Sequence, residues 1–574
     1  MIQKLQRRYL PENFEVNTWE DIGPYFDALQ KAPIASKHDL ENWLNQLSEL
    51  EAVISEDACW RQIRMTCDTA NTELQQRFEY FCTHIQPQVQ VYADELNKKL
   101  MASPFVKELD TATYFTMLRN IEKNITLFRA ENVAIQSELS VLQQQYGAIA
   151  GQMTVEVDGQ IFTLQQAAKF LENPNREKRE EVYKKIYERR LQNAPELNDL
   201  YTQLIQKRHQ VAINAGYSHY TPYKFVEMGR FDYTPADCAK FHEGVKQHVL
   251  PLVNHIYAEK KKELQLDVLK PWDLEAIPAD KKPLKPFTNT DDLLGKTKTC
   301  LQNLDPFFAD CLQTMQQMGR FDLESRTGKA PGGYNCPLAE TGAPFIFMNA
   351  AGTMDDVVTM VHEGGHAVHS FLAHPLALTA FKEYPTEMAE VASMAMELFS
   401  MQHWDVFFTN KTELLQAKLH QLERVITIFP WIAIIDKFQH WVYAHPSHSV
   451  EERMATWQQI RAEFASSELD TTGLENLLAH SWQRQLHLFE VPFYYIEYGI
   501  AQLGAIAMWR QFQQNGERAL QHYKQALALG GTKTLPELYT AAGIEFSFEP
   551  GYVAELMQFV WVETEKLQRE AATS

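Results

Sequence analysis

The sequence predicts a mainly α-helical fold with a small β-sheet. Apolar residues recur at intervals of three and four through most of the 574-residue chain, which is the period of a helix with one buried face. Strand patterns are sparse. Apolar and polar residues alternate clearly in TVEVDGQIFTL (residues 154–164), and PFIFMN (residues 344–349) has strand character. Such a pattern favours helices packed on one another around a minor sheet.

Two lobes are predicted, residues 1–195 and residues 196–574. The first begins with long helical segments and continues through the 154–164 hairpin, whose turn is Asp158-Gly159. The second is helical almost throughout and carries the PFIFMN strand. We expect the second lobe to be the catalytic domain, because the motifs described below lie within it.

Composition narrows the classes of function. The chain has 54 Lys and Arg against 74 Asp and Glu, and its formal net charge of −20 argues against nucleic acid and anionic membrane as partners. The longest strongly apolar run, residues 425–435, is about half a membrane span and contains Pro430, so we expect a buried helix there. The seven cysteines form no CxxC pair, which is typical of a reducing compartment. The expected location is the cytoplasm.

The segment VVTMVHEGGHAVHSFLA (residues 357–373) places polar groups on the apolar side of a predicted helix. His362 and His366 are four residues apart and project from one face, where both imidazoles can reach one ion. Zn²⁺ favours such nitrogen ligands. Glu363 is rotated about a quarter turn from His362, so its carboxylate can reach water at the metal without binding the metal. This H-E-x-x-H spacing is typical of a metallohydrolase.

The same segment contains a third histidine and two adjacent glycines whose roles also need an explanation. His369 lies on nearly the same face as His362, and it is either a supporting residue of the site or a packed core histidine. Gly364 and Gly365 should weaken the helix. They predict that another backbone approaches the helix closely, because only glycine leaves room for it.

A third ligand is expected on the apolar segment YPTEMAEVASMAMELFSM (residues 384–401). Glu387, Glu390 and Glu397 share one face of its helix, and carboxylates among apolar residues need cationic or hydrogen-bonding partners. We assign Glu390 as the third ligand of a single Zn²⁺ and Glu397 as the carboxylate that orients a ligand imidazole. Glu387 is the rival ligand. Co²⁺ or Mn²⁺ could occupy the same three ligands.

These motifs and a late segment resemble a known family. HEGGHAVHS, AEVAS (residues 389–393) and HLFEVPFYYIEYGIAQ (residues 487–502) are similar to the zinc oligopeptidases of the thimet oligopeptidase and oligoendopeptidase F group, in particular its bacterial oligoendopeptidase F branch. The resemblance implies a multi-helix zincin-type (gluzincin) metallopeptidase fold with a deep substrate channel. Such a channel would admit short unfolded peptides and exclude folded proteins.

The resemblance also implies roles by position. His362 and His366 match the family's two histidine ligands, and Glu390 matches its glutamate ligand. Glu363 matches the general base. Glu397 matches a carboxylate seven residues beyond the glutamate ligand.

In the late segment the family uses a histidine and tyrosines over the metal to stabilise the oxyanion. The matching residues are His487, Tyr495 and Tyr498, with Tyr494 as the alternative to Tyr495. Independently of the resemblance, Tyr495 and Tyr498 share one helical face, and phenol hydroxyls are suitable donors to a developing oxyanion. An aromatic core is the other interpretation. PFIFMN matches the family's edge strand, which pairs with the substrate backbone.

The predicted function is that of a zinc endopeptidase that hydrolyses internal bonds of short unfolded oligopeptides. Zinc would polarise the scissile carbonyl and lower the pKa of its water, while Glu363 takes a proton from that water and passes it to the leaving amine. Two alternatives stay open. A zinc metallocarboxypeptidase would need a cationic residue for the terminal carboxylate, and a helical binding protein would hold peptides without cutting them. The sequence predicts no particular oligomeric state.

Overall fold

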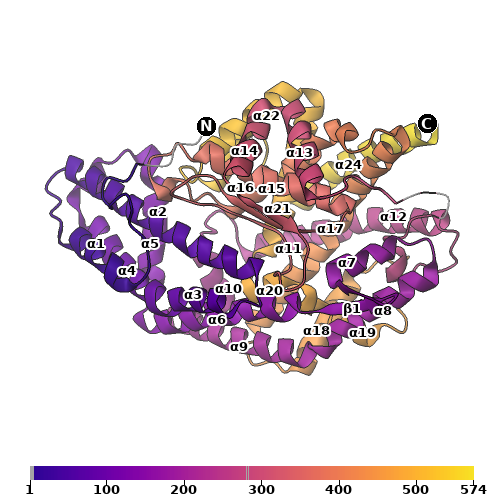
Figure 1. The fold of residues 1–574 in the computed structure, drawn as a ribbon, viewed down its shortest axis with the longest axis horizontal. Helices are drawn as coiled ribbons and strands as arrows, with labels where there is room; N and C mark the ends of the chain where they lie inside the picture. The colour runs from indigo at the N-terminus through magenta and orange to yellow at the C-terminus, as the bar shows by residue number, and fades with distance from the viewer. Residues whose placement is uncertain (1–5, 279–280, 282, 574) are drawn as a thin grey trace.

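The computed structural model describes residues 6–278, 281 and 283–573. Helices dominate this part of the chain, and the strands form a two-stranded and a three-stranded sheet. The predicted mainly α fold with a small β-sheet is therefore confirmed. Figure 1 shows the first helices of the chain on one side of the molecule and the helices α15, α16 and α21 near its centre.

The helices follow one another along the described part of the chain, and the longest connection without a masked residue, between α14 and α15, carries the strands of the second sheet. From the N-terminal side they are α1 (Trp19–Lys31), α2 (Lys37–Cys67), α3 (Thr72–Tyr80), α4 (Gln86–Ala102), α5 (Thr111–Leu127), α6 (Ala130–Gly151), α7 (Leu164–Ala168), α8 (Arg176–Gln192), α9 (Ala194–Asn214), α10 (Tyr220–Glu227), α11 (Pro235–Gly244), α12 (Leu250–Glu263), α13 (Thr290–Leu304) and α14 (Pro306–Gln317). They continue with α15 (Met354–Ala373), α16 (Thr386–Ser400), α17 (Lys411–Ala444), α18 (Val450–Glu463), α19 (Glu475–Ala479), α20 (Leu486–Glu490), α21 (Tyr495–Gln514), α22 (Gly516–Ala528), α23 (Leu535–Ala541) and α24 (Pro550–Thr573).

The two sheets correspond to the two strand segments seen in the sequence. β1 (Thr154–Val157) and β2 (Gln160–Thr163) form the expected hairpin, and Asp158 and Gly159 in its turn have positive φ angles. The second sheet has the order β3-β5-β4, with β3 (Phe321–Glu324) parallel and β4 (Tyr334–Cys336) antiparallel to β5 (Phe345–Ala350).

This order corrects the expectation that PFIFMN is an edge strand. β5 is the central strand, and five of its six residues are buried. A continuous apolar run suits a strand that is covered on both faces and paired on both sides, so the same apolar character that suggested a strand belongs to the middle of the sheet. β4 and β3 are the edges.

Most of the chain shares one hydrophobic core, and a second cluster fills the N-terminal helices α1, α2 and α4. The main core extends from Leu127 to Val560 and includes residues on both sides of position 195. The division into lobes at that position stays a prediction. The apolar run 425–435 lies buried in α17, as predicted. Among the described residues, no helix combines the length and apolar character needed to cross a membrane.

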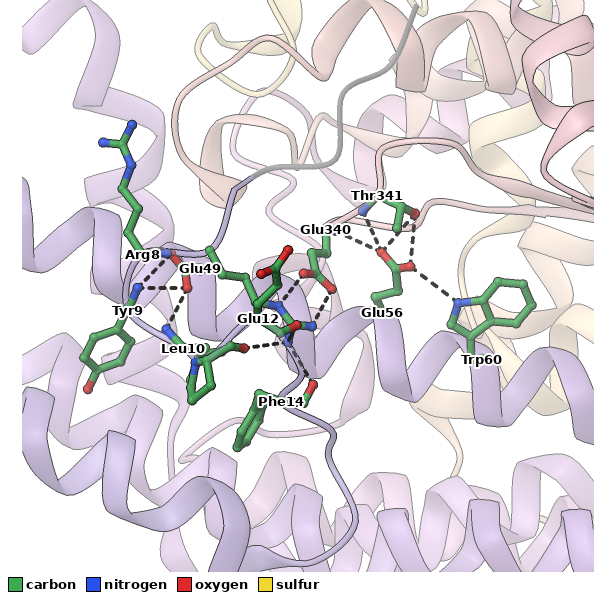
Figure 2. Close-up of polar contacts among 12 residues, drawn as sticks. Arg8, Tyr9, Leu10, Glu12, Phe14, Glu49, Glu56, Trp60, Glu340 and Thr341 are labelled. Carbon is green, nitrogen blue, oxygen red and sulfur yellow. Dashed lines mark hydrogen bonds and ion pairs between the residues drawn. The ribbon is translucent and has the colours of Figure 1, made fainter.

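One buried carboxylate joins the N-terminal helices to the segment before β5. Glu56 on α2 accepts hydrogen bonds from the backbone N–H groups of Glu340 and Thr341, at 3.0 and 2.8 Å, and from the Thr341 hydroxyl at 3.0 Å (Figure 2). Arg7 forms an ion pair with the Glu340 side chain at 2.6 Å. Charge-assisted hydrogen bonds are stronger than neutral ones, so this contact holds α2 against the segment that leads into β5.

Candidate metal centre

The helix α15 starts from a well-formed cap and packs tightly on α16. Asp356 accepts hydrogen bonds from three successive backbone N–H groups that precede the helix, at 2.7–2.9 Å. A Cβ added to Gly365 would lie 2.6 Å from both Ala392 O and Ser393 Cα, so α16 leaves room only for glycine there. The predicted close approach is confirmed for Gly365. It is wrong for Gly364, where an added Cβ would meet only Leu301 at 3.6 Å.

The structure brings His362, His366 and Glu390 together. The Nε2 atoms of His362 and His366 lie 3.3 and 3.6 Å from the same oxygen, Oε2 of Glu390. The three potential ligand atoms lie within 4.8 Å of one another. Two imidazole nitrogens and a carboxylate oxygen are the donor set of a catalytic zinc site, and the histidine side chains keep 16% and 15% exposure, so solvent can reach them. The residues therefore fit a zinc ion.

Glu397 lies behind His362. Its Oε1 is 2.7 Å from Nδ1 of His362, and its Oε2 accepts a hydrogen bond from Gln421 of α17 at 2.9 Å. A carboxylate on Nδ1 fixes the ring so that Nε2 points toward Glu390. This is the contact that the spacing of Glu390 and Glu397 suggested.

Buried charges set the protonation states of the cluster. Burial, helped by the neighbouring His362, lowers the pKa of His366 to about 4 against the opposing effect of Glu390, so this imidazole is neutral at pH 7. Burial works to raise the pKa of Glu390, but His366, His362 and Tyr494 together lower it to about 2. A neutral imidazole and an ionised carboxylate are the forms that bind metal.

Glu363 is left free beside this cluster. Its side chain is buried, and Oε2 has no hydrogen-bond partner among the described residues. Burial, with help from Glu390 and Glu397, raises its pKa to about 7. A carboxylate with such a pKa can both take and return a proton near neutral pH.

Tyr498 and His487 form a second polar pair from α21 and α20. His487 Nε2 and the Tyr498 hydroxyl are 3.1 Å apart, and Gln485 Nε2 lies 2.7 Å from His487 Nδ1. Burial lowers the pKa of His487 to about 4, so the ring is neutral. If the Gln485 amide donates to Nδ1, then Nε2 donates to Tyr498 and leaves the tyrosine proton available for another acceptor.

The tyrosine that touches the metal ligands is Tyr494. Its hydroxyl donates a hydrogen bond to Glu390 Oε1, whereas the ring of Tyr495 packs edge-on against His487 and Tyr498 at 5.0 and 5.2 Å between centroids. Both tyrosines have a helical spacing to Tyr498, so periodicity alone does not separate them. The positive φ of 65° at Phe493, two residues before the first residue of α21, sets the direction of this turn and gives no signal in the sequence.

Two further candidates have partners outside the cluster. Glu387 accepts a hydrogen bond from the Tyr233 hydroxyl at 2.6 Å. His369 is fully buried and stacks on Tyr384 at 3.5 Å and 15°. The metal-ligand cluster of α15 and α16 contains neither residue.

This fold and donor set place the chain in the class of helical proteins that pair an H-E-x-x-H helix with a glutamate from the next helix. The chain belongs to peptidase family M3. The profile described as Peptidase family M3 matches residues 169–558, and that described as Peptidase M3 N-terminal domain matches residues 11–128. The resemblance drawn from the motifs is confirmed.

Relatives with curated names are distant in sequence. The chain is 22% identical over 387 residues to the oligoendopeptidase F homolog of Borreliella burgdorferi, covering 66% of this chain and 63% of the relative. It is 23% identical over 308 residues to oligopeptidase PepF of Bacillus subtilis, covering 52% of this chain and 44% of the relative. The matched region thus spans less than two thirds of either relative.

Solved structures share the fold over almost the whole chain. Pz peptidase A with an inhibitor superposes with a TM-score of 0.92 at 24% identity, covering 97% of this chain and 99% of that one. The oligoendopeptidase-F of Enterococcus faecium gives a TM-score of 0.66 at 14% identity, covering 97% and 98%. At these identities the likeness shows a common fold.

Proposed function

We propose that the chain is a zinc-dependent endopeptidase that hydrolyses internal bonds of short unfolded oligopeptides. The observation that carries the proposal is the convergence of His362, His366 and Glu390 beside Glu363, whose Oε2 has no hydrogen-bond partner among the described residues. Membership of a peptidase family, and relatives named oligoendopeptidase F, support the choice of peptides as substrate.

His362, His366 and Glu390 would hold the ion, and Glu397 would orient His362. When bound, zinc supplies a Lewis acid for the scissile carbonyl and lowers the pKa of a coordinated water. Glu363 takes a proton from the attacking water and later gives it to the leaving amine, a role that suits its raised pKa.

Tyrosine hydroxyls would stabilise the negative charge that develops on the scissile carbonyl oxygen. Tyr498, whose oxygen is held by His487, has a proton to donate to the oxyanion. Tyr494 reaches Glu390 directly and holds this carboxylate in place. The sequence-based choice of Tyr495 stays a prediction, and Tyr494 is the stronger candidate because of its contact.

The edge strand β4 is the better candidate for pairing with the substrate backbone. β5 is covered on both sides, whereas β4 pairs with β5 along one side only. Asn335 of β4 donates a hydrogen bond to the backbone oxygen of Glu363 at 3.2 Å, so this strand lies next to the general base. An extended peptide added to β4 would pass beside Glu363.

The seven cysteines are all free thiols, which supports a reducing compartment such as the cytoplasm as the place of action.

The test combines metal analysis with mass spectrometry of peptide cleavage. We expect one zinc at this cluster and cuts inside peptides of mixed sequence, at equal rates for free and amidated carboxyl termini. A strict need for a free terminus would favour a carboxypeptidase instead. Glu363→Gln should lower kcat by about 10³-fold while zinc is retained, because a general base contributes about 10²–10⁴-fold. Asp355→Asn, an exposed carboxylate on the same helix, is the control.

A further inference from the structure

A second set of metal-ligating side chains lies between α11 and α17. Helix α11 carries Cys238, and helix α17 carries Asp436 and His440. The Cys238 sulfur, a carboxylate oxygen of Asp436 and a ring nitrogen of His440 lie within 4.8 Å of one another. Asp436 is fifteen residues beyond Gln421 on α17, which corresponds to about 22 Å along the helix. This cluster is therefore separate from the one that includes Glu397.

The spacing suits a small tetrahedral ion. His440 Nε2 and Asp436 Oδ2 are 3.3 Å apart and come from adjacent turns of one helix. Two ligands that are each about 2.1 Å from a tetrahedral ion lie about 3.4 Å from each other. The imidazole and the carboxylate are thus already at the separation that shared coordination requires.

Two atoms of the cluster lack hydrogen-bond partners. Among the described residues, neither Asp436 Oδ1 nor His440 Nε2 makes a hydrogen bond, although Asp436 is completely buried. A buried carboxylate oxygen without a partner is destabilising, because it has lost its hydrogen bonds to water and gained none in exchange. His242, one turn after Cys238 on α11, satisfies only the other oxygen, with Nε2 2.9 Å from Oδ2.

We propose that Cys238, Asp436 and His440 bind a second divalent transition-metal ion, most naturally Zn²⁺, and that His242 supports the Asp436 carboxylate. Sulfur and imidazole ligands select zinc over calcium and magnesium. The carboxylate and the thiolate together balance the two positive charges, which favours burial of the whole group. Binding releases the proton of the Cys238 thiol to solvent, because the thiolate is the ligand.

The ion would be structural and would act on the turn before α21. It would tie α11 to α17 at His440, whose neighbour Gln439 accepts a hydrogen bond from the backbone N–H of Phe493. The Phe493 ring also packs against the His440 ring, tilted by 62° with 5.1 Å between centroids, and Phe493 directly precedes Tyr494. The second site thus lies behind the turn that positions the catalytic tyrosines.

Cobalt substitution of the purified full-length protein tests this site without reference to activity. The cluster of His362, His366 and Glu390 has no sulfur ligand, so of the two metal-ligand clusters among the described residues only the one with Cys238 can give a sulfur-to-cobalt charge-transfer band. We expect two bound metal ions per chain with this band in the wild type. Cys238→Ser and His440→Gln should each bind one ion, Cys238→Ser without the band. His366→Ala should also bind one ion but keep the band.

Cys311→Ser, at another fully buried thiol, is the matched control and should behave as the wild type. His440→Gln changes a partly exposed side chain and replaces Cys238→Ser as the test if the latter does not fold. The proposal is overturned if the cobalt-loaded wild type shows no charge-transfer band. It is also overturned if Cys238→Ser or His440→Gln binds as much metal as the wild type. Because His366→Ala removes only the catalytic ion, failure of the proposed peptidase activity would leave this result unaffected.

Discussion

The hydroxyl of Tyr494 donates a hydrogen bond to Oε1 of Glu390, a residue 104 positions earlier in the chain. The other oxygen of the same carboxylate faces His362 and His366. Glu390 is therefore held at one oxygen by α21's first turn and presents the other to the proposed metal.

This contact predicts different effects for two adjacent tyrosines. Tyr494→Phe removes the hydrogen bond to Glu390, and we expect zinc affinity to fall about 10–100-fold, as for other partners of metal ligands. Tyr495→Phe should change zinc affinity little, because its ring packs on His487 and Tyr498. Competition with a chelator of known affinity measures both. Equal losses in the two variants would contradict the assignment.

The two candidate glutamate ligands can be separated in the same way. Glu390→Gln should abolish tight zinc binding at the cluster of His362 and His366, because the amide is a poor substitute for a charged ligand beside two histidines. Glu387→Gln should retain one zinc at this cluster, since its carboxylate is hydrogen-bonded to Tyr233. Elemental analysis after dialysis gives the answer. Metal loss in Glu387→Gln with retention in Glu390→Gln would reverse the assignment.

Gly364 and Gly365 provide a matched pair of variants that tests how closely α15 packs on α16. Gly365→Ala forces a Cβ to within 2.6 Å of the α16 backbone, and overpacking of this kind costs about 1–3 kcal/mol, so Tm should fall. Gly364→Ala makes only an ordinary 3.6 Å contact and gains helix propensity, so Tm should stay unchanged or rise. Thermal unfolding of the metal-depleted proteins separates packing from metal loss. A lower Tm in Gly364→Ala than in Gly365→Ala would refute the argument.

Glu363 predicts a pH dependence of stability in the metal-depleted protein. Its folded pKa of about 7 lies above the ordinary value of 4.5, so between these values the folded state holds a proton that the unfolded state has lost. Stability therefore falls as pH rises from about 4.5 to 7, by roughly 3 kcal/mol at most, and is level above that range.

Glu363→Gln has no such proton, so its stability relative to the wild type should increase over the same interval. Unfolding midpoints of both proteins across this pH range measure the difference. A constant difference between them would show that Glu363 is not buried as described.

Local spacing predicted much of the fold and of the metal cluster. The three- and four-residue periodicity identified the helices, and the four-residue separation of His362 and His366 placed two imidazoles together because a helix repeats every 3.6 residues. Glu390 was found because a carboxylate on an apolar helix needs a partner.

Features that depend on how separate segments meet in the folded chain were not predicted from the sequence. The position of β5 within its sheet depends on its pairing with β3 and β4, two short strands that carry weak patterns of their own. The choice between Tyr494 and Tyr495 depends on one backbone angle at Phe493. The cluster of Cys238, Asp436 and His440 joins helices about 200 residues apart, and a spacing of four in each helix is too common to be noticed alone.

The Glu56 contact with Glu340 and Thr341 bears on how the chain can be shortened. The Peptidase family M3 match begins at residue 169, but cutting the chain there would remove the acceptor for two amides that lead into β5. β5, the strand that pairs with β4 beside Glu363, would then lose this anchor. Truncation to the peptidase region should therefore yield a loosened catalytic sheet, and co-expression of the missing helices should restore it.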